Sequence, residues 1–536
     1  MRRVLTQEQQ GLFPLRSVAD VVRLFALELD KKRPSVALLS VVAGAVEHSL
    51  TAVRPDADSP DAADEHPSAD AETVPLPPLE YDTVFALYAK FCSLVLDAVD
   101  LAAYDRSEGT PRDLVKRVSD VVWFSLARSY HKDKPHIQSL YSFLTGNRLD
   151  CLGVALAVVA ACQVLGLDDV LLALSEDHAW VVFGPERSQT AEVTWHGKGN
   201  EDKRGQPIGV SSARSWLYLN GGAVTCNAHM QVAAVVASIS PTISGSADSA
   251  EVSLLQQRLL WLLHDRDTLA AYPLALCTLA GLEEQRATPD RPKPLELLRE
   301  AVTVARERYG NRHVYPYTTL GSYYYRKKQY EKALETWASG TEPLKHYDYS
   351  RDDEEVYKEL MEITIDHIPH IIKEVGSGIS AHSLIREPRC YLHLLRFYDG
   401  LCHWEQDSST PVLHIGWAKQ MVGCVAKFDP EVRRRAAVTC AADGDRTDTP
   451  TSVSDKDDST TPSVTLYSEK MAGLRDLLTS ERFNPQAMSL QLTAQSQVSS
   501  RRRDDDDGRR TKRQRRDTGS AAAAAAPHAA PAVTAE

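Results

Sequence analysis

Three glutamates spaced along one predicted helix offer the clearest binding chemistry in the sequence. Glu355, Glu359 and Glu362 lie at positions i, i+4 and i+7, so their carboxylates share one helix face. Such a column could pair with arginine or lysine side chains of a bound peptide. Acidic helix faces are more often simply solvated, so the column by itself leaves both interpretations open.

Aromatic residues precede the acidic column and favour the binding interpretation. They are Tyr315, Tyr317, Tyr323, Tyr325 and Trp337. Some of them must belong to the core, because aromatic residues at helical spacing fill the seam between helices. The remaining aromatics and the carboxylates predict a groove for an extended peptide that carries basic and apolar side chains. The sequence therefore indicates a peptide-binding scaffold rather than an enzyme.

The elements that must position these residues are helices. A tetratricopeptide helix–turn–helix spacing is shared by Leu320, Gly321, Tyr324, Tyr330, Ala333 and Trp337. From residue 227 to residue 382 the pattern is helical throughout, and paired helices at this spacing stack as a solenoid-like array. The predicted helices are Met230–Ile239, Val252–Leu263, Leu269–Leu282, Leu295–Tyr309, a hairpin over 317–340, and Asp352–Val375.

Residues 104–226 differ from this helical region, because helices come first and short apolar runs follow. The predicted helices are Asp113–His131 and Cys151–Leu165. The predicted strands are Val170–Leu174, Ala179–Phe183, Ala191–Trp195 and Trp216–Leu219. This order is typical of an α+β unit with a small antiparallel sheet.

The strongest enzyme-like signal lies in this α+β unit. Cys151 begins a helix, and Asp177-His178-Ala179-Trp180 enters a strand. The pattern resembles the transglutaminase-like fold, in which a helix-starting cysteine, a strand histidine and an aspartate on the next strand form a nucleophile triad. A helix N-terminus lowers a thiol pKa, and a histidine can take its proton. Glu192 or Thr194 stands where aspartate is expected, so we favour a fold that has lost catalysis. A cysteine-nucleophile acyl transferase or protease is the alternative.

The two ends of the chain contain further helices separated by polar stretches. In residues 1–103, Ser17 and Asp20 predict a helix start, helices follow over 35–50 and 81–103, and residues 52–80 read as a disordered loop. Residues 383–440 contain the predicted helices Cys390–Trp404 and His414–Phe428. Residues 441–463 are expected to be disordered. A helix over Tyr467–Leu478 and a short stretch over Leu490–Val498 complete a segment, 464–498, that packs on the body.

Composition narrows the class of protein. The chain has 536 residues, 43% of them hydrophobic and 25% charged, which suffices for a sizeable core, and a net charge of −12 that argues against a nucleic-acid binder as a whole. Nine scattered cysteines include no Cys-x-x-Cys pair, which fits a reducing compartment without disulfides or metal. The longest apolar run, Gly153–Leu167, contains Gln163 and falls short of the ~20 residues of a membrane span. We expect an intracellular, soluble protein with no membrane contact and no cofactor.

The basic tail over 499–536 is a local exception to the acidic balance. Between residues 501 and 516 it holds nine basic residues against four aspartates: Arg501, Arg502, Arg503, Arg509, Arg510, Lys512, Arg513, Arg515 and Arg516. Two basic clusters at this spacing predict a two-part nuclear import signal. The alternative is a solvated, disordered tail that binds DNA weakly and without sequence preference.

With these segments in hand, the chain resembles the menin family of nuclear tumour-suppressor scaffolds, as a divergent member of non-vertebrate type. The strings that carry the resemblance are Gly11–Ser17, Leu174–Gly184, Thr190–Asp202, Leu260–Leu263, Leu394–Gly400 and Leu490–Val498. The resemblance implies a mainly α protein: an N-terminal domain (1–103), a transglutaminase-like α+β thumb (104–226), a helical palm with tetratricopeptide-like hairpins (227–382) and helical fingers (383–440). It also implies that the protein is not an enzyme.

The resemblance implies specific partners as well. Family members receive, in a central cavity, the N-terminal peptide of mixed-lineage-leukaemia-type (MLL-type) histone H3 lysine-4 methyltransferases. A similar peptide of the transcription factor JunD competes for this cavity. Together with the methyltransferase peptide, the family recruits the chromatin reader lens epithelium-derived growth factor. The implied function is regulation of transcription through chromatin, without a cofactor or metal.

Carried over position by position, the resemblance assigns seventeen peptide-binding residues. From the thumb they are Asp133, Leu174, Ser175, Asp177, His178 and Ala179. From the palm they are Ala234, Ala237, Tyr272, Leu274, Tyr315, Thr318, Tyr325, Trp337, Glu355, Glu359 and Glu362. The three glutamates would face the peptide's arginines.

Six positions depart from the vertebrate pattern that the resemblance implies. Vertebrate members carry Phe at Ala234, Cys at Ala237, Met at Leu274 and Thr318, Cys at Tyr325, and Ser at Cys151. Several large apolar contacts thus shrink here while one grows, so the affinity for a ligand tailored to the vertebrate pocket should change.

The tail generates the first testable prediction. Deletion of residues 499–536 removes all nine basic residues of the import signal, so the protein should shift towards the cytoplasm while its domains stay folded. Imaging of a fluorescently tagged protein measures the shift, and circular dichroism checks the fold. Unchanged nuclear accumulation would place the signal elsewhere in the chain.

Overall fold

The computed structural model describes residues 5–51, 74–127, 134–194, 202–208, 214–349, 354–376, 384–406, 415–441 and 463–492. The chain divides into two compact units. The first contains residues 1–348 and 352–357, and the second contains residues 349–351 and 358–536. Helices dominate both units and the sheets are small, which confirms the predicted mainly α fold.

The first unit begins with four helices: α1 Gln7–Gln10, α2 Val18–Leu29, α3 Val36–Thr51 and α4 Tyr81–Ala98. The predicted helix start at Ser17 is confirmed. The Ser17 side chain accepts a hydrogen bond from the Asp20 backbone N–H, and Asp20 reaches back to the Ser17 N–H. The predicted helix over 35–50 corresponds to α3, which is buried along almost its whole length.

The predicted disordered loop over 52–80 is wrong at its end. Pro75–Leu79 forms strand β2, which pairs antiparallel with β1, Leu15–Ser17. The Leu76 side chain is buried, so this proline-rich stretch gains apolar contacts that its composition did not indicate. A strand of a two-stranded sheet tolerates proline because its outer edge needs no N–H donors. Residues 52–73 lie outside the described part of the chain.

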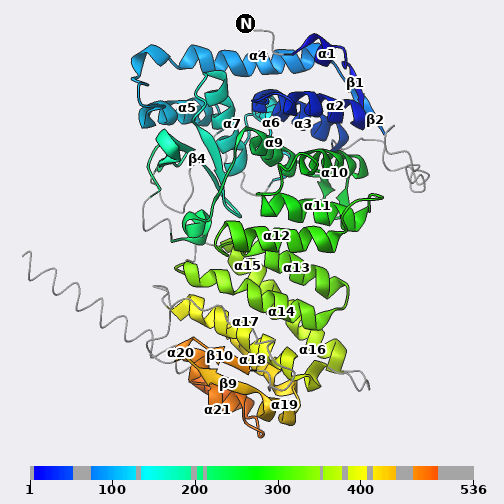
Figure 1. Ribbon diagram of the computed structural model, residues 1–536, viewed down its shortest axis with the longest axis vertical. Coiled ribbons are helices and arrows are strands. Elements are labelled where there is room, and N and C mark those ends of the chain that lie inside the picture. The colour runs from blue at the N-terminus through cyan, green and yellow to red at the C-terminus, as the bar shows by residue number, and fades with distance from the viewer. Residues whose placement is uncertain are drawn as a thin grey trace, which may run out of the picture. The chain divides into compact units, whose positions relative to one another are not determined.

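Three helices precede a four-stranded antiparallel sheet in the α+β region. The helices are α5 Arg112–Phe124, α6 Leu140–Gly146 and α7 Cys151–Val164. The strands, in spatial order, are β5 Gln189–Ala191, β4 Ala179–Phe183, β3 Leu171–Leu174 and β6 Val224–Thr225. Figure 1 shows α7 beside this sheet. The predicted order of helices first and an antiparallel sheet after them is confirmed.

Two strand predictions in this region need correction. Trp216–Leu219 is not a strand but part of the 3₁₀ helix Trp216–Gly221, because Leu219 and Asn220 adopt φ values of 53° and 43° that an extended chain excludes. The fourth strand is β6. The strand predicted over 191–195 begins and ends earlier, as β5. Helix α5 likewise ends at Phe124, before the predicted end at residue 131.

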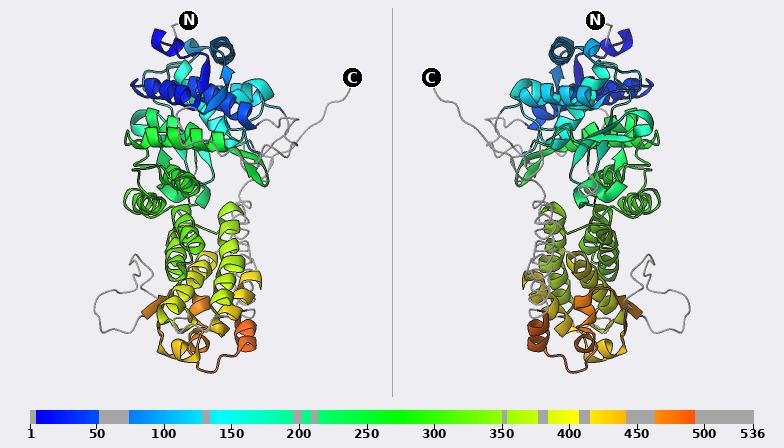
Figure 2. Two further views of the ribbon diagram at one scale, coloured as in Figure 1. Left: turned by 90° about the vertical axis from the view of Figure 1, so that its right-hand side faces the viewer. Right: turned by 90° about the vertical axis from the view of Figure 1, so that its left-hand side faces the viewer.

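Six helices follow one another along the rest of the first unit: α9 Ala228–Ala237, α10 Ala250–His264, α11 Pro273–Gln285, α12 Pro294–Arg308, α13 Tyr315–Arg326 and α14 Tyr330–Gly340. Three of them carry proline in the first turn, where its missing N–H has no partner to lose. Figures 1 and 2 show α9 to α14 as successive rows of helices. The prediction of continuous helix misses one hairpin, β7 Thr242–Ser244 with β8 Ala247–Asp248.

A close approach between α13 and α14 depends on a glycine. A Cβ atom at Gly321 would lie 2.4 Å from Cδ1 of Trp337, far inside contact distance. The Trp337 side chain is buried, and its Nε1–H donates to the Thr318 carbonyl oxygen at 3.4 Å. The predicted hairpin over 317–340 therefore forms with the small residue where the two helices meet.

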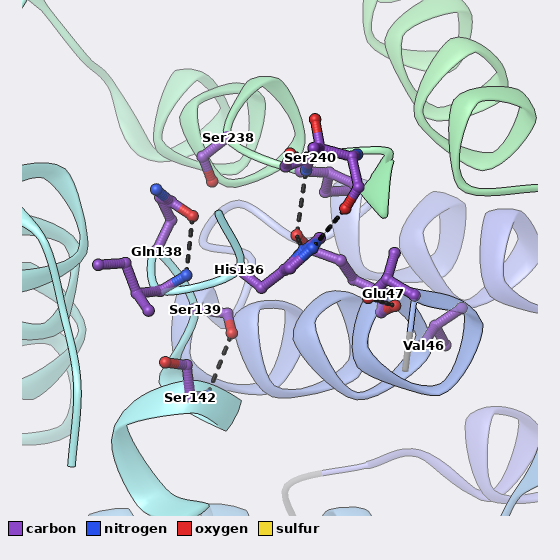
Figure 3. Close-up of polar contacts among 12 residues, drawn as sticks. Val46, Glu47, His136, Gln138, Ser139, Ser142, Ser238 and Ser240 are labelled. Atoms are coloured by element: carbon purple, nitrogen blue, oxygen red, sulfur yellow. Dashed lines mark hydrogen bonds and ion pairs between the residues drawn. The ribbon is translucent and has the colours of Figure 1, made fainter. Parts of the chain in front are cut away.

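A histidine links three segments near the middle of the first unit. His136 Nδ1 lies 2.7 Å from the Glu47 carboxylate of α3, and its Nε2 lies 2.6 Å from the Thr242 carbonyl oxygen of β7. The Ser240 N–H donates to the same carboxylate at 3.1 Å, and Figure 3 shows the imidazole between these groups. Both ring nitrogens face acceptors, which favours the protonated imidazole. The hydrogen bond to Glu47 is the main cause of the raised pKa of His136. Protonated His136 therefore stabilises the folded state. This contribution is complete below the ordinary histidine pKa and is lost as the pH rises through the raised pKa of His136.

The described residues of the second unit form helices and one two-stranded sheet. Helix α15, Glu354–Glu362, runs from the first unit into the second and continues through a π-helical turn, Ile363–His367, into α16, Ile368–Gly376. The other helices are α17 Pro388–Gln406, α18 Ile415–Lys427, α19 Pro430–Arg435, α20 Glu469–Ala472 and α21 Arg475–Leu478. Strands β9 Ala437–Cys440 and β10 Ser463–Leu466 pair in parallel.

Two predictions fail in the second unit. The helix predicted over Tyr467–Leu478 is broken at Gly473 into α20 and α21. Residue 463, predicted to be disordered, begins β10, whose partner β9 lies in a segment predicted to be only helical. Within the described residues no single helix is long and apolar enough to cross a membrane, and one pair bent by 97°, α6 with α7, passes that test by length and composition only.

The α13–α14 contact generates a prediction about stability. Gly321→Ala should lower the free energy of unfolding by about 1–3 kcal/mol, because the new methyl group forces the Trp337 ring away. Gly281 is the matched control: it lies in α11, is exposed, and has no atom within 4 Å of a new Cβ. Gly281→Ala should raise stability by about 0.5–1 kcal/mol. Urea unfolding measures both variants, and equal effects of the same sign would contradict the packing argument.

Candidate functional site

The turn between β3 and β4 carries five of the predicted peptide-binding residues. Leu174 and Ala179 form the last strand pair, and both are buried. The Ser175 N–H donates to the His178 carbonyl oxygen at 2.9 Å, and the Ser175 hydroxyl oxygen accepts from the His178 N–H at 2.9 Å. This reciprocal pair closes the turn and leaves Asp177 at its partly exposed tip. Asp133, the sixth predicted residue from this region, lies outside the described residues.

His178 makes a buried contact with a carboxylate. His178 Nε2 lies 2.8 Å from Glu192 Oε2, and both side chains are almost fully buried. Glu192 also accepts from the Tyr218 hydroxyl at 2.9 Å and from the Thr194 N–H and hydroxyl at 3.0 Å. Burial by itself would raise the pKa of Glu192, but the His178 imidazole and these donors lower it to about 2. Of the two residues considered in place of the aspartate, Glu192 is therefore the one that contacts the histidine, and Thr194 donates hydrogen bonds to Glu192.

Cys151 is the first residue of α7, as predicted, but its surroundings oppose thiolate formation. Asp150 caps the helix by accepting from the Gly153 N–H at 2.7 Å. The Cys151 thiol points to the Asp177 carbonyl oxygen at 4.0 Å. Burial, and then the nearby carboxylates of Asp150 and Asp177, raise the pKa of Cys151 well above its ordinary value. The expectation that the helix N-terminus lowers this pKa is thus wrong, since burial and negative charge outweigh the helix dipole.

The start of α13 meets the β3–β4 turn. The Tyr315 N–H donates to Glu176 Oε1 in that turn at 2.7 Å. The Tyr315 ring lies 5.5 Å from the Trp216 ring, measured between centroids. Two predicted sets of site residues, the turn residues and Tyr315, are thereby brought together within the first unit.

The predicted residues of the helices divide by exposure. Those whose side chains are buried are Ala234, Tyr272, Thr318 and Trp337. Those that are partly exposed are Ala237, Leu274, Tyr315 and Tyr325. The Tyr325 ring lies 5.9 Å from the Trp337 ring. The buried side chains therefore pack in the interior of the first unit. The partly exposed side chains are the ones that a ligand could contact.

Helix α15 contains the predicted carboxylate column. Glu355 and Glu359 are half-buried, and Glu362 is exposed. The apolar side of the same helix is formed by the buried Val356 and Leu360, and the buried Ile363 of the following π-helical turn continues it. The carboxylates therefore lie beside the packed stripe of an amphipathic helix, with one turn between Glu355 and Glu359.

Sequence reasoning missed three residues that shape this site: Glu176, Trp216 and Tyr218. A carboxylate two residues after the end of an apolar strand was a signal for Glu176, because a buried charge needs partners. Its partners, however, come from 40 and 138 or more positions further along the chain, a distance that no local pattern reveals.

No group of three or more His, Cys, Asp or Glu side chains that could hold a metal ion occurs among the residues that the structure describes. The nine basic residues predicted as an import signal lie outside the described part of the chain.

Comparisons with known proteins place this geometry in context. The family model described as Menin matches residues 5–459 and 447–526. Among solved structures, the chain is similar to a menin crystal structure described as revealing the binding site for the Mixed Lineage Leukemia (MLL) protein. The two chains share 45% sequence identity, the match covers 90% of this chain and 99% of the other, and the TM-score is 0.75.

The environment of Cys151 generates a prediction about reactivity. Because burial and negative charge raise its pKa, Cys151 should remain unmodified by iodoacetamide at pH 7.5, whereas the exposed Cys440 is alkylated. Cys151→Ser should preserve the fold and peptide binding, and the wild type should form no covalent acyl-enzyme with activated esters. Peptide mass spectrometry measures both reactions. An acyl adduct on Cys151 that the serine variant lacks would overturn this conclusion.

Proposed function

The chain belongs to the menin family, and on that premise we propose that it is a scaffold that binds the N-terminal peptide of an MLL-type histone methyltransferase. The observation that carries the proposal is its similarity, over nearly the whole chain, to a menin whose structure defines an MLL binding site. The assigned residues contain the chemistry that such a peptide requires, namely aromatic surfaces and carboxylates.

The proposed contacts divide between apolar and charged groups. Tyr315 and Tyr325 are partly exposed above buried rings, so each presents an aromatic surface that is already fixed in place. Glu355 and Glu359 attract the peptide's basic side chains, and an arginine that reaches both gains two charge-assisted hydrogen bonds. The chemistry of these residues therefore favours a peptide that carries both basic and aromatic side chains over an acidic one.

We further propose the wider role that belongs to such a scaffold. It would act in the nucleus, entering through the basic tail, and regulate transcription by holding a histone methyltransferase near chromatin. A JunD-type transcription factor would compete for the same peptide site. A chromatin reader of the lens epithelium-derived growth factor type would bind together with the methyltransferase peptide, and the tail would add weak non-specific contacts to DNA.

The contact between His178 and Glu192 is the observation that favours the alternative of an acyl transferase or protease. A carboxylate that orients a histidine is part of such a triad. The alternative also needs a thiolate at Cys151, and the raised pKa of that thiol opposes it. We therefore assign the pair a structural role: its buried hydrogen bond links the residue before β4 to the residue after β5.

The carboxylate column generates a test of the proposed function. Changing both Glu355 and Glu359 to Lys should leave α15 helical, because lysine forms helices as readily as glutamate. It should nevertheless weaken binding of a methyltransferase-type basic-aromatic peptide by about 2–5 kcal/mol, since like charge replaces attraction in a partly buried site. Calorimetric titration measures the affinity, and circular dichroism monitors the fold.

Gln at both positions is the matched control for this test. Gln removes the charge without reversing it, so the loss of peptide affinity should be smaller than with Lys. The difference in affinity between the two variants should decrease as salt screens the exposed part of the contact. Equal affinity of the wild type and both variants would show that the column is only a solvated helix face. The proposed contacts between these two glutamates and the peptide's basic side chains would then be wrong.

A further inference from the structure

We propose that Glu176 is a positioning residue for peptide binding: it fixes Tyr315 and the first turn of α13 against the β3–β4 turn. The inference rests on the proposed peptide-binding function, because Tyr315 is one of the assigned contact residues. Glu176 does not touch the peptide in this scheme. It acts through the residues that it holds.

The Glu176 carboxylate is fully buried and collects N–H donors from two distant segments. Its Oε1 accepts from the Tyr315 N–H at 2.7 Å, and its Oε2 accepts from the Val314 N–H at 3.0 Å. The Trp216 indole Nε1–H donates to Oε2 at 2.7 Å. Each of these donors would be left unsatisfied in the interior without the carboxylate, which is costly for a buried group.

Two of the three donors are the orphan N–H groups at the start of α13. A helix start is usually capped by the side chain of its own N-cap residue, but here that residue is Val314, which has no acceptor. Glu176 supplies the missing acceptor from another part of the chain. Its negative charge also lies at the positive end of the helix dipole, where it is favourable.

The nearest histidine does not neutralise Glu176 at neutral pH. His313 Nδ1 lies 4.0 Å from Glu176 Oε1. Burial lowers the pKa of His313 to about 4, although its hydrogen bond to the Gly222 carbonyl opposes that shift. The imidazole is therefore uncharged at pH 7. The Glu176 carboxylate is stabilised by the N–H groups of α13 and Trp216 and not by a positive charge on His313.

The same carboxylate controls the surface on which the Tyr315 ring rests. Trp216 is buried, and its ring lies 5.5 Å from that of Tyr315 with the ring planes at 58°. Because Glu176 holds both the Tyr315 backbone and the Trp216 indole, its loss should release the ring and its support together. Tyr315 would then sample orientations that do not match the peptide. The apparent affinity would equal the affinity of the matching orientation multiplied by the fraction of molecules that adopt it.

The first experiment uses Glu176→Gln in the full chain. Glutamine has nearly the same shape, but it keeps only one acceptor oxygen, and its N–H₂ group faces an N–H donor whose hydrogen bond a carboxylate oxygen accepts. Calorimetric titration with the basic-aromatic peptide, at a temperature where circular dichroism shows all proteins folded, should give roughly tenfold weaker binding. Hydrogen exchange of the amides at the start of α13 should become faster, a change that is measured without peptide.

A matched control is available in the same unit. Glu283 is buried and, like Glu176, accepts from an indole, Trp261 Nε1–H at 2.6 Å, and from a backbone N–H, Thr288 at 2.7 Å. Glu283→Gln should lower the unfolding temperature about as much as Glu176→Gln does. It should leave both the peptide affinity and the exchange of α13 unchanged, which separates positioning from general destabilisation.

A double-mutant cycle tests whether Glu176 acts through Tyr315. In a Tyr315→Ala background, Glu176→Gln should cause little further loss of affinity, because the residue that it positions is gone. A full additional loss in that background would overturn the inference. Should Glu176→Gln fail to fold, Trp216→Phe replaces it, since phenylalanine keeps a ring but removes one donor to Glu176, and a loss of severalfold in affinity is expected.

The outcomes distinguish this inference from the proposed function. If the wild type does not bind the peptide, the proposed function fails and the inference fails with it. If the wild type binds and Glu176→Gln binds equally well with unchanged exchange of α13, the inference alone is overturned. Weaker binding of Glu176→Gln with unchanged binding of Glu283→Gln supports both.

Discussion

A carboxylate buried away from water must be surrounded by donors, and this requirement determines how distant segments of the chain meet. Burial by itself raises a carboxyl pKa, and backbone N–H groups offset only part of that rise. Asp399 illustrates this limit within the second unit: it accepts from the Tyr467 and Ser468 N–H groups, yet burial still raises its pKa to about 6. Glu192, with an imidazole at 2.8 Å, shows the opposite balance, and its pKa falls to about 2. The charged form of Glu192 thus stabilises the fold above the ordinary glutamate pKa, and that stabilisation is lost as pH falls towards 2.

Contacts between distant segments also decide which structural features could be predicted from the sequence. Helices with a local signal were predicted well: the Ser17–Asp20 capping pair, and the small-residue spacing at Gly321, depend on neighbours within a few turns. Strands were predicted less well, because Pro75–Leu79 and Ala437–Cys440 become strands only through partners that are distant or weakly patterned. Pairing of this kind is a tertiary effect that overrides local propensity.

The candidate site shows the same division between local and distant determinants. The acidic spacing of α15 is local, and α15 contains all three glutamates as expected. The reactivity of Cys151 is not local, because the helix start that should favour a thiolate is outweighed by burial and by nearby carboxylates. A nucleophile motif therefore indicates only where a thiol lies. Its environment decides whether that thiol ionises, and here burial and the nearby carboxylates oppose ionisation.

The division of the proposed site residues by exposure predicts how substitutions at the positions expected to depart from vertebrate members would act. Ala234 and Thr318 are buried within α9 and α13, so a larger side chain at either position would alter a ligand contact only by moving the helix that bears it. Ala237, Leu274 and Tyr325 are partly exposed, so substitutions there would change a proposed ligand contact directly. The two groups should therefore affect binding differently. Substitutions at the buried positions change stability and affinity together, whereas substitutions at the exposed positions change affinity alone.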